Sequence, residues 1–273
     1  MIELEGSRSA AMTYETILFD LEGGVARLTL NRPDKLNSFN VRMHEEVRHA
    51  LDAVRGGSAR VLVLSGAGRG FCAGQDLADR TVAPGGQSVD LGDSIERYYK
   101  PLVLALHHLP MPVIGAVNGV AAGAGANIAL ACDLVIAARS ASFVQAFCRL
   151  GLVPDSGGTW SLPRLVGDAR ALGLALLGEK LSAEQAAAWG MIWQCVDDAE
   201  FSATVDALAR RLAAAPTLGL AATKAAIRGG RQRSLEEQLD IERDLQRELG
   251  CSADYAEGVA AFTAKRQPAF EGR

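Results

Sequence analysis

The chain has 273 residues, of which 49% are hydrophobic and 22% charged, and its formal net charge is −4. This composition is typical of a globular protein with one large domain, or one domain and a small appendage. The mildly acidic balance argues against nucleic acid as a partner, because nucleic acid is bound by basic faces. No apolar run reaches the roughly 18 residues of a membrane span, so we expect no membrane partner.

The cysteines and the first residues both favour a cytoplasmic protein. The five cysteines lie at positions 72, 132, 148, 195 and 251 without CxxC spacing, which indicates free thiols in a reducing compartment. Residues 1–12 are polar and lack the apolar region of a signal peptide, so we interpret them as a disordered leader.

The first elements follow from turn and cap residues. Residues 15–30 predict two strands around Glu22-Gly23-Gly24, which is a hairpin signal. Asn40 is a good N-cap for a helix running to about Arg55. A further helix is predicted over Ile95–Leu109, ended by prolines 110 and 112. Residues 80–93, rich in Gly, Pro, Ser and Asp, predict a mobile loop.

Two stretches each lead from a buried strand into glycines. Val61–Leu64 enters Ser65–Leu77, and Pro112–Asp133 passes a turn at Asn118-Gly119 and continues with glycines at 123 and 125. Glycine lets a ligand approach, and the first N–H groups of a following helix lack partners. Two such N–H groups that converge on one point would form an oxyanion hole.

Several common catalytic sites are absent from the sequence. His44 and His49 are five residues apart, about 140° around a helix, whereas HExxH puts its histidines on one face, so we expect no metal site. The chain has no GxSxG elbow to support Ser156 and no GxxxxGK[ST] phosphate loop. Residues 123–128 lack the third glycine of a dinucleotide-binding GxGxxG.

The second half changes to alanine-rich helices with clear caps. Helices are predicted near 183–190, 203–214, 218–227, 235–249 and 253–265, with capping boxes at Ser182 and Ser234. We therefore predict an α/β protein with a leader at 1–12, a core at 13–200 and a helical C-terminal region at 201–273.

Several motifs together carry a family resemblance over about residues 15–270. They are Asn31-Arg-Pro33, Leu36-Asn37, Phe71–Leu77, Ala116–Gly119, Ala122-Gly123, Cys132-Asp133, Gly151–Pro154, Gly157-Gly158, Glu257-Gly258, Phe262 and Lys265-Arg266. With these the chain resembles the crotonase, or enoyl-CoA hydratase/isomerase, superfamily. The resemblance implies a spiral of ββα units, a homotrimer or a hexamer built as a dimer of trimers, and acyl-CoA thioester substrates. It also implies that the N–H groups of Ala73 and Ala124 form the oxyanion hole, with CoA as part of the substrate and no separate cofactor.

The departures from the family pattern are informative. The two glutamates with which hydratases activate and deliver water fall on Asn127 and Phe147, and neither an amide nor a phenyl ring exchanges protons near neutral pH. An acid appears instead at Asp155, near where isomerases and dehalogenases of the superfamily carry a catalytic carboxylate. Pro-Asp-Ser-Gly is also plain turn chemistry, so a turn residue is the alternative for Asp155.

Within the family, the runs 151–167, 176–193 and 252–266 are most similar to isomerases that rearrange an aromatic ring epoxide attached to CoA and also shift double bonds. We expect Asp155, in an apolar pocket that raises its pKa, to carry a proton from one carbon to another. The remaining substrate contacts expected by resemblance are Lys35, Asn37, Ser38, Gly74, Gln75, Asp76, Leu77, Gly123, Phe147, Pro154 and Lys265. A solvated surface lysine is the alternative for Lys265.

Other functions stay open at the level of sequence. One is a fatty-acid Δ3,Δ2-enoyl-CoA isomerase or a hydratase-like enzyme, which would differ in the acyl pocket. Another is a non-catalytic acyl-CoA-binding subunit, which the loss of both hydratase acids permits and the presence of Asp155 disfavours.

Overall fold

Two sheets form the centre of the protein, for which a computed structural model describes residues 13–76 and 90–273. One sheet has the strand order β1-β2-β3-β5-β7-β10 and the other β4-β6-β8-β9. Neighbouring strands are parallel except in the pairs β1–β2 and β8–β9. The strands are β1 (Ile17–Glu22), β2 (Val25–Leu30), β3 (Val61–Gly66), β4 (Gly70–Cys72), β5 (Val113–Val117), β6 (Val120–Ala122), β7 (Leu134–Ala138), β8 (Ser142–Val144), β9 (Lys180–Ser182) and β10 (Gln194–Val196).

Helices follow the strands in a repeated pattern. The chain runs from the large sheet directly into the small one at β3–β4, β5–β6 and β7–β8. Helical segments return it to the large sheet after β4 and β6, whereas after β8 it reaches β9 of the small sheet before α7 leads to β10. This is the predicted spiral of ββα units. The helices are η1 (Pro33–Lys35), α1 (Val41–Gly56), α2 (Leu91–Ser94), η3 (Ile95–Tyr99), α3 (Lys100–His108), α4 (Ala124–Ala131), η4 (Ala146–Leu150), α5 (Gly158–Val166), α6 (Asp168–Leu177), α7 (Ala183–Ala188), α8 (Phe201–Ala213), α9 (Thr217–Gly230), α10 (Leu235–Leu249) and α11 (Ala253–Thr263).

The central strands β3 and β5 of the large sheet are buried on both faces. In β3, Leu62 and Leu64 join the main core, whereas Val61 and Val63 face a second core with Val205 and other apolar residues of α8. Successive residues of a strand point to opposite faces, so an unbroken apolar run is what a doubly covered strand requires. The prediction of a buried strand here is confirmed.

The predicted hairpin and N-cap are also confirmed. β1 and β2 pair antiparallel around Gly23 and Gly24, whose φ angles of +55° and +78° are those of a type I′ turn. The Asn40 side chain accepts a hydrogen bond from the Met43 N–H at the start of α1.

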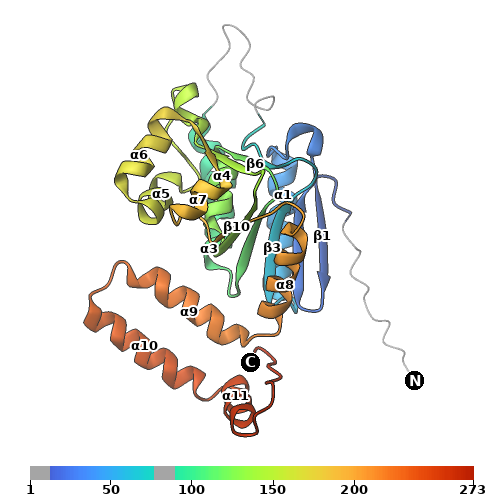
Figure 1. Ribbon diagram of the computed structural model, residues 1–273, viewed down its shortest axis with the longest axis vertical. Coiled ribbons are helices and arrows are strands. Elements are labelled where there is room, and N and C mark those ends of the chain that lie inside the picture. The colour runs from blue at the N-terminus through green and yellow to red at the C-terminus, as the bar shows by residue number, and fades with distance from the viewer. Residues whose placement is uncertain (1–12, 77–89) are drawn as a thin grey trace.

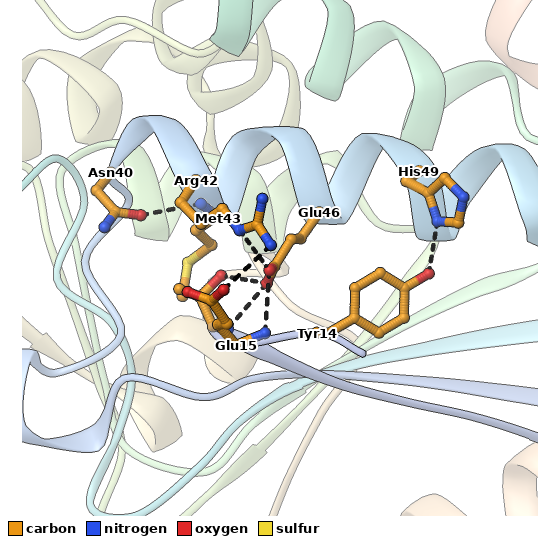
Figure 2. A network of polar contacts seen from close by, with 8 residues as sticks. Tyr14, Glu15, Asn40, Arg42, Met43, Glu46 and His49 are labelled. Atoms are coloured by element: carbon orange, nitrogen blue, oxygen red, sulfur yellow. Dashed lines mark hydrogen bonds and ion pairs between the residues drawn. The ribbon is translucent and has the colours of Figure 1, made fainter. Parts of the chain in front are cut away.

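A buried carboxylate ties the start of the chain to α1 (Figure 2). Glu46 accepts hydrogen bonds from the backbone N–H groups of Glu15 and Thr16, from the Thr16 hydroxyl and from Arg42. On the same helix His49 contacts the Tyr14 hydroxyl, 2.8 Å from Nδ1. The edge strand β1 is thereby held against α1 near its first residues.

The predicted helix Ile95–Leu109 begins earlier and is irregular. Asp90 caps α2 by accepting from the N–H groups of Gly92 and Asp93, so the helical segment starts at Leu91. Residues Ile95–Tyr99 form a π-helical turn just before Pro101. Proline lacks an N–H group, which explains why the α-helical bonding pattern changes there.

Helices α9 to α11 form a separate layer below the sheets (Figure 1). Helix α8, by contrast, covers the large sheet, so this layer begins at Thr217. The Ser234–Glu237 capping box that starts α10 is confirmed. Arg60 holds the layer to the core by donating to the Thr217 hydroxyl and to two backbone carbonyls.

Three further observations bear on the predictions. The five cysteines are free thiols. Over residues 13–76 and 90–273, every helix is too short or too polar to cross a lipid bilayer. The predicted leader 1–12 lies outside the described residues, as does most of the predicted loop 80–93.

Candidate active site

The two glycine-containing segments meet in the structure. A Cβ atom added at Gly74 would lie 3.0 Å from the Ala122 carbonyl oxygen and 3.3 Å from the Ala124 nitrogen. One added at Gly125 would lie 2.2 Å from the Cys72 carbonyl oxygen. The backbones after β4 and β6 are therefore in direct contact, which side chains would prevent.

The start of α4 offers backbone donors at this junction. Gly123, with φ of +54°, precedes the helix, and its N–H donates to the Val144 carbonyl. In the described part of the chain no acceptor takes the N–H groups of Ala124 or Gly125. The first N–H groups of a helix are unpaired within it and carry its positive end, so this site suits a carbonyl oxygen that gains negative charge.

The predicted donor Ala73 is engaged elsewhere. Its N–H donates to the Leu36 carbonyl at 2.9 Å, and the next N–H, that of Gly74, points to the Cys72 sulfur at 3.4 Å. Leu36 reaches this position with a left-handed φ of +47°. The structure therefore gives Ala73 the role of linking two loops and does not present its N–H to a substrate.

Asn37 and Asp76 also have partners within the protein. The Asn37 amide is fully buried, donates to the Ala67 and Gly70 carbonyls and accepts from the Arg32 N–H. The Asp76 carboxylate pairs with Arg32 at 2.8 Å. Both were expected to contact CoA, but the structure gives them the role of shaping the loops.

The other expected CoA contacts lie along the same edge or beyond it. Phe39 pairs with the 74–76 segment, since its N–H donates to the Gly74 carbonyl and it forms a bridge to Gln75. This brings Ser38, the neighbour of Phe39, close to Gly74 and Gln75, and the exposed Lys35 precedes Leu36, whose carbonyl accepts from the Ala73 N–H. Leu77 lies outside the described residues. Lys265 follows α11, at the opposite end of the molecule from β6 (Figure 1).

Asp155 lies in a turn that is tied to α4. Its carbonyl accepts from the Gly158 N–H and from the Asn127 side-chain amide, both at 2.8 Å. Ser156 and Gly157 have φ angles of +49° and +83°, and the Ser156 hydroxyl donates to the Asp155 carboxylate. Asn127 and Ala124 are one turn apart on α4, so the only expected acid of the site is held close to the expected oxyanion donor.

Apolar groups complete the surroundings. Phe147 is buried and lies against Gly123, where an added Cβ would be 3.7 Å from the ring. Pro154 is half-buried just before the acid. Behind the turn, a cavity of about 430 Å³ is bordered by Asn127, Ser156, Leu130, Trp160 and Ile227, among others.

The nearby thiols are unreactive near neutral pH. Burial raises the pKa of Cys72 to about 12, against a minor lowering by the Gly74 N–H. Burial, with the neighbouring Asp133 charge, likewise raises the pKa of Cys132 to about 12. Neither forms a thiolate near neutral pH, so nucleophilic cysteine chemistry is excluded here. Among residues 13–76 and 90–273, no cluster of three or more His, Cys, Asp or Glu could hold a metal ion.

Two groups of residues around the site escape sequence reasoning. Gln145 donates from Nε2 to the Asn127 carbonyl oxygen at 2.9 Å. Asp133 pairs with Lys224 and Arg228 of α9 on the far side of the cavity. Asp133 stands in the Cys132-Asp133 motif, but its partners on α9, like the Gln145 partner of Asn127, are distant in sequence, so no local signal points to these pairs.

Comparisons with known proteins agree with this geometry. The sequence profile of the enoyl-CoA hydratase/isomerase family matches residues 20–273. The 1,2-epoxyphenylacetyl-CoA isomerase of Escherichia coli K12 is 61% identical over 260 residues, covering 95% of this chain and 99% of the relative. The trans-2-decenoyl-[acyl-carrier-protein] isomerase of Streptococcus mutans is 35% identical over 96% of this chain and 100% of the relative.

A solved structure supports the same assignment. The crystal structure of enoyl-CoA hydratase from Bacillus anthracis superposes with a TM-score of 0.89 at 32% identity, covering 95% of this chain and 100% of that one. Fold and sequence thus agree with the predicted resemblance. The chain belongs to the enoyl-CoA hydratase/isomerase family.

Proposed function

We propose that this protein is an acyl-CoA isomerase that converts 1,2-epoxyphenylacetyl-CoA to oxepin-CoA and also moves double bonds in unsaturated acyl-CoA thioesters. One observation carries the proposal: the acid Asp155 is tied through Asn127 to α4, whose first N–H groups are available at Ala124. The 61% identity with the Escherichia coli isomerase supports the choice of substrate.

The chemistry follows from these two groups. The thioester oxygen accepts a hydrogen bond from Ala124 at the start of α4, and each such donor stabilises an enolate-like state by about 3–4 kcal/mol. Asp155 takes a proton from the carbon next to the thioester and returns it to another carbon of the same molecule. Both conversions leave the composition of the substrate unchanged, so one carboxylate is enough and no cofactor is required.

Hydration does not fit these residues. The Asn127 amide already donates to the Asp155 carbonyl, and Phe147 presents a phenyl ring. Neither group activates water by exchanging a proton. We therefore expect crotonyl-CoA to be hydrated far more slowly than a double bond is moved.

Replacing Asp155 by Asn tests the assignment. The variant should lose isomerisation of both the epoxide and an unsaturated acyl-CoA while still binding acyl-CoA, and the wild type should exchange the hydrogen next to the thioester with deuterium from solvent. Full activity of D155N would contradict the proposal. Tight binding without deuterium exchange in the wild type would instead favour a non-catalytic acyl-CoA-binding subunit.

A second candidate is an isomerase of aliphatic enoyl thioesters. The Streptococcus mutans relative, by its name an isomerase of a decenoyl thioester, supports it. We assign the cavity behind the Asp155 turn to the aromatic ring or the aliphatic chain of the acyl group. Most of its lining is apolar, and two of its basic residues, Lys224 and Arg228, are already paired with Asp133, while Arg231 also borders it. Comparing turnover of 3-hexenoyl-CoA with that of the epoxide separates the two candidates.

We propose that CoA lies along Lys35, Ser38, Gly74 and Gln75 and that copies of the chain associate. The C-terminal layer exposes apolar side chains, with Phe262 87% exposed; the others are Leu218, Ile227, Leu235, Leu239, Tyr255 and Val259. Such a face favours burial against another copy. A homotrimer or hexamer would bring Lys265 of one subunit toward the CoA of another, and mass measurement in solution tests this.

Five free thiols favour the cytoplasm.

A further inference from the structure

A directional chain of side-chain amides lies behind the Asp155 turn. Gln145 donates from Nε2 to Oδ1 of Asn127 at 2.9 Å, and Asn127 donates from Nδ2 to the Asp155 carbonyl at 2.8 Å. Gln145 is 3% exposed and Asn127 is 1% exposed. Both bonds are therefore protected from competition with solvent.

The direction of this chain is fixed by its last member. A backbone carbonyl only accepts hydrogen bonds, so Asn127 must turn its NH₂ group toward Asp155 and its oxygen toward Gln145. Gln145 must then present its own NH₂ group. Its oxygen, Oε1, is left buried without a hydrogen-bond partner in the part of the chain that the structure describes.

An unpartnered buried oxygen is unfavourable. An apolar side chain of similar size would remove this oxygen but would leave Oδ1 of Asn127 without its donor, so the fit of glutamine at position 145 rests on the bond that it gives to Asn127. What glutamine supplies, and an apolar residue would not, is the donor that fixes the orientation of Asn127.

The turn has little freedom to move independently of Asn127. A Cβ atom on Gly158 would lie 2.3 Å from the Asn127 amide nitrogen, so the start of α5 packs directly on this amide. A change in the orientation of Asn127 would therefore shift the turn that carries Asp155.

We propose that Gln145 is a positioning residue for proton transfer by Asp155. It fixes the Asn127 amide, which fixes the Asp155 turn relative to the N–H groups at the start of α4. This inference rests on the proposed isomerase function and extends it to a residue that touches neither the acid nor the substrate.

Replacing Gln145 by Leu removes the donor with little change of volume. We expect kcat for isomerisation to fall about 10-fold to 100-fold, because a displacement of about 1 Å has effects of this size. KM should change less than about two-fold, since the loops that hold CoA are untouched. The thermal unfolding temperature should change little, since the substitution removes the unpartnered Oε1 of Gln145 but leaves Oδ1 of Asn127 without its donor. The matched control is Gln194→Leu at the exposed first residue of β10, which should leave kcat and KM unchanged.

Two more variants distinguish positioning from packing. In Gln145→Glu the carboxylate cannot donate near neutral pH, so kcat should be at least as low as in Gln145→Leu. The ratio of the Gln145→Glu kcat to the wild-type kcat should rise as the pH falls, because the carboxyl group then protonates and can donate. Combining Gln145→Leu with Asn127→Leu should reduce kcat no further than Asn127→Leu alone, because both act through one chain of bonds.

The outcomes separate this inference from the proposed function. If Asp155→Asn is inactive but Gln145→Leu keeps the wild-type kcat, or if the two Leu substitutions multiply independently, the positioning role is wrong and the isomerase assignment stands. If Asp155→Asn keeps full activity, the isomerase assignment itself fails.

Discussion

Lys224 of α9 lies with its Nζ 2.8 Å from a carboxylate oxygen of Asp133, the residue that ends the glycine-rich segment after α4. The second oxygen of Asp133 pairs with Arg228 at 2.7 Å, and the Val113 N–H donates to the first. Lys224 also donates to the Leu106 and Met111 carbonyls. These bonds join the C-terminal helical layer to the part of the core that carries the site.

Replacing Asp133 by Asn should destabilise the protein by about 3–5 kcal/mol, because it leaves two largely buried cations without their counter-charge. Chemical denaturation measures the change. Arg139→Ala is the matched control, since its pairs with Glu184 and Asp197 are exposed and should contribute less than about 1 kcal/mol. Equal losses in the two variants would show that the Asp133 cluster does not hold the helical layer.

The same region should give the stability a dependence on pH through His107. Burial, followed by the charges of Arg228, His108 and Lys224, lowers the pKa of His107 from 6.5 to about 4. Between these values the unfolded chain binds a proton that the folded protein does not, so stability should fall as the pH drops from about 6.5 to 4. His107→Gln should lose part of this dependence in denaturation curves at pH 7 and pH 4. A variant with the same difference between the two pH values would contradict the assignment.

How much of the structure the sequence predicts depends on how far apart in the sequence the interacting residues lie. The hairpin at Gly23-Gly24, the cap at Asn40 and the apolar run of β3 are local signals, and all are confirmed. The hydrogen bond between Asn127 and Asp155 joins residues that are 28 apart in the sequence. From the sequence alone, Asn127 indicates only that the glutamate of a hydratase is absent at this position. Folding gives that amide a role that its position in a motif does not reveal.

The prediction for Ala73 fails for a related reason. A strand followed by Ala-Gly predicts exposed backbone donors, but the Leu36 carbonyl comes from a separate loop to take the Ala73 N–H. Glycine and helix-start signals indicate where backbones approach, and the two loops do meet at Gly74 and Ala124. They do not identify which N–H group is available, because that depends on a partner elsewhere in the chain.

Glu46 should stabilise the edge strand in a pH-dependent way. Burial acts to raise its pKa, but hydrogen bonds from Thr16 and Glu15 and the Arg42 charge outweigh it, so the pKa lies below the ordinary value of 4.5. Its contribution is therefore present above pH 4.5 and lost as the pH falls through the lowered folded pKa. Glu46→Gln should cost about 2–3 kcal/mol at pH 7 and less at pH 3, measured by denaturation at each pH. A cost that does not shrink at pH 3 would mean that packing, and not charge, holds β1.

Gly74→Ala tests the junction of the two loops. The φ of Gly74 is +91°, which favours glycine, and an added Cβ would approach the Ala122 oxygen and the Ala124 nitrogen. We expect kcat/KM for isomerisation to fall about 100-fold or more, because the methyl group blocks the donor at the start of α4. Gly173→Ala in α6 is the matched control: no atom lies within 4 Å of its added Cβ, so it should raise stability by about 0.5–1 kcal/mol and leave kcat/KM unchanged. Circular dichroism of both variants separates misfolding from a blocked site. A folded Gly74→Ala variant with the wild-type kcat/KM would mean that the thioester oxygen binds elsewhere, and the Ala124 N–H would lose its proposed role.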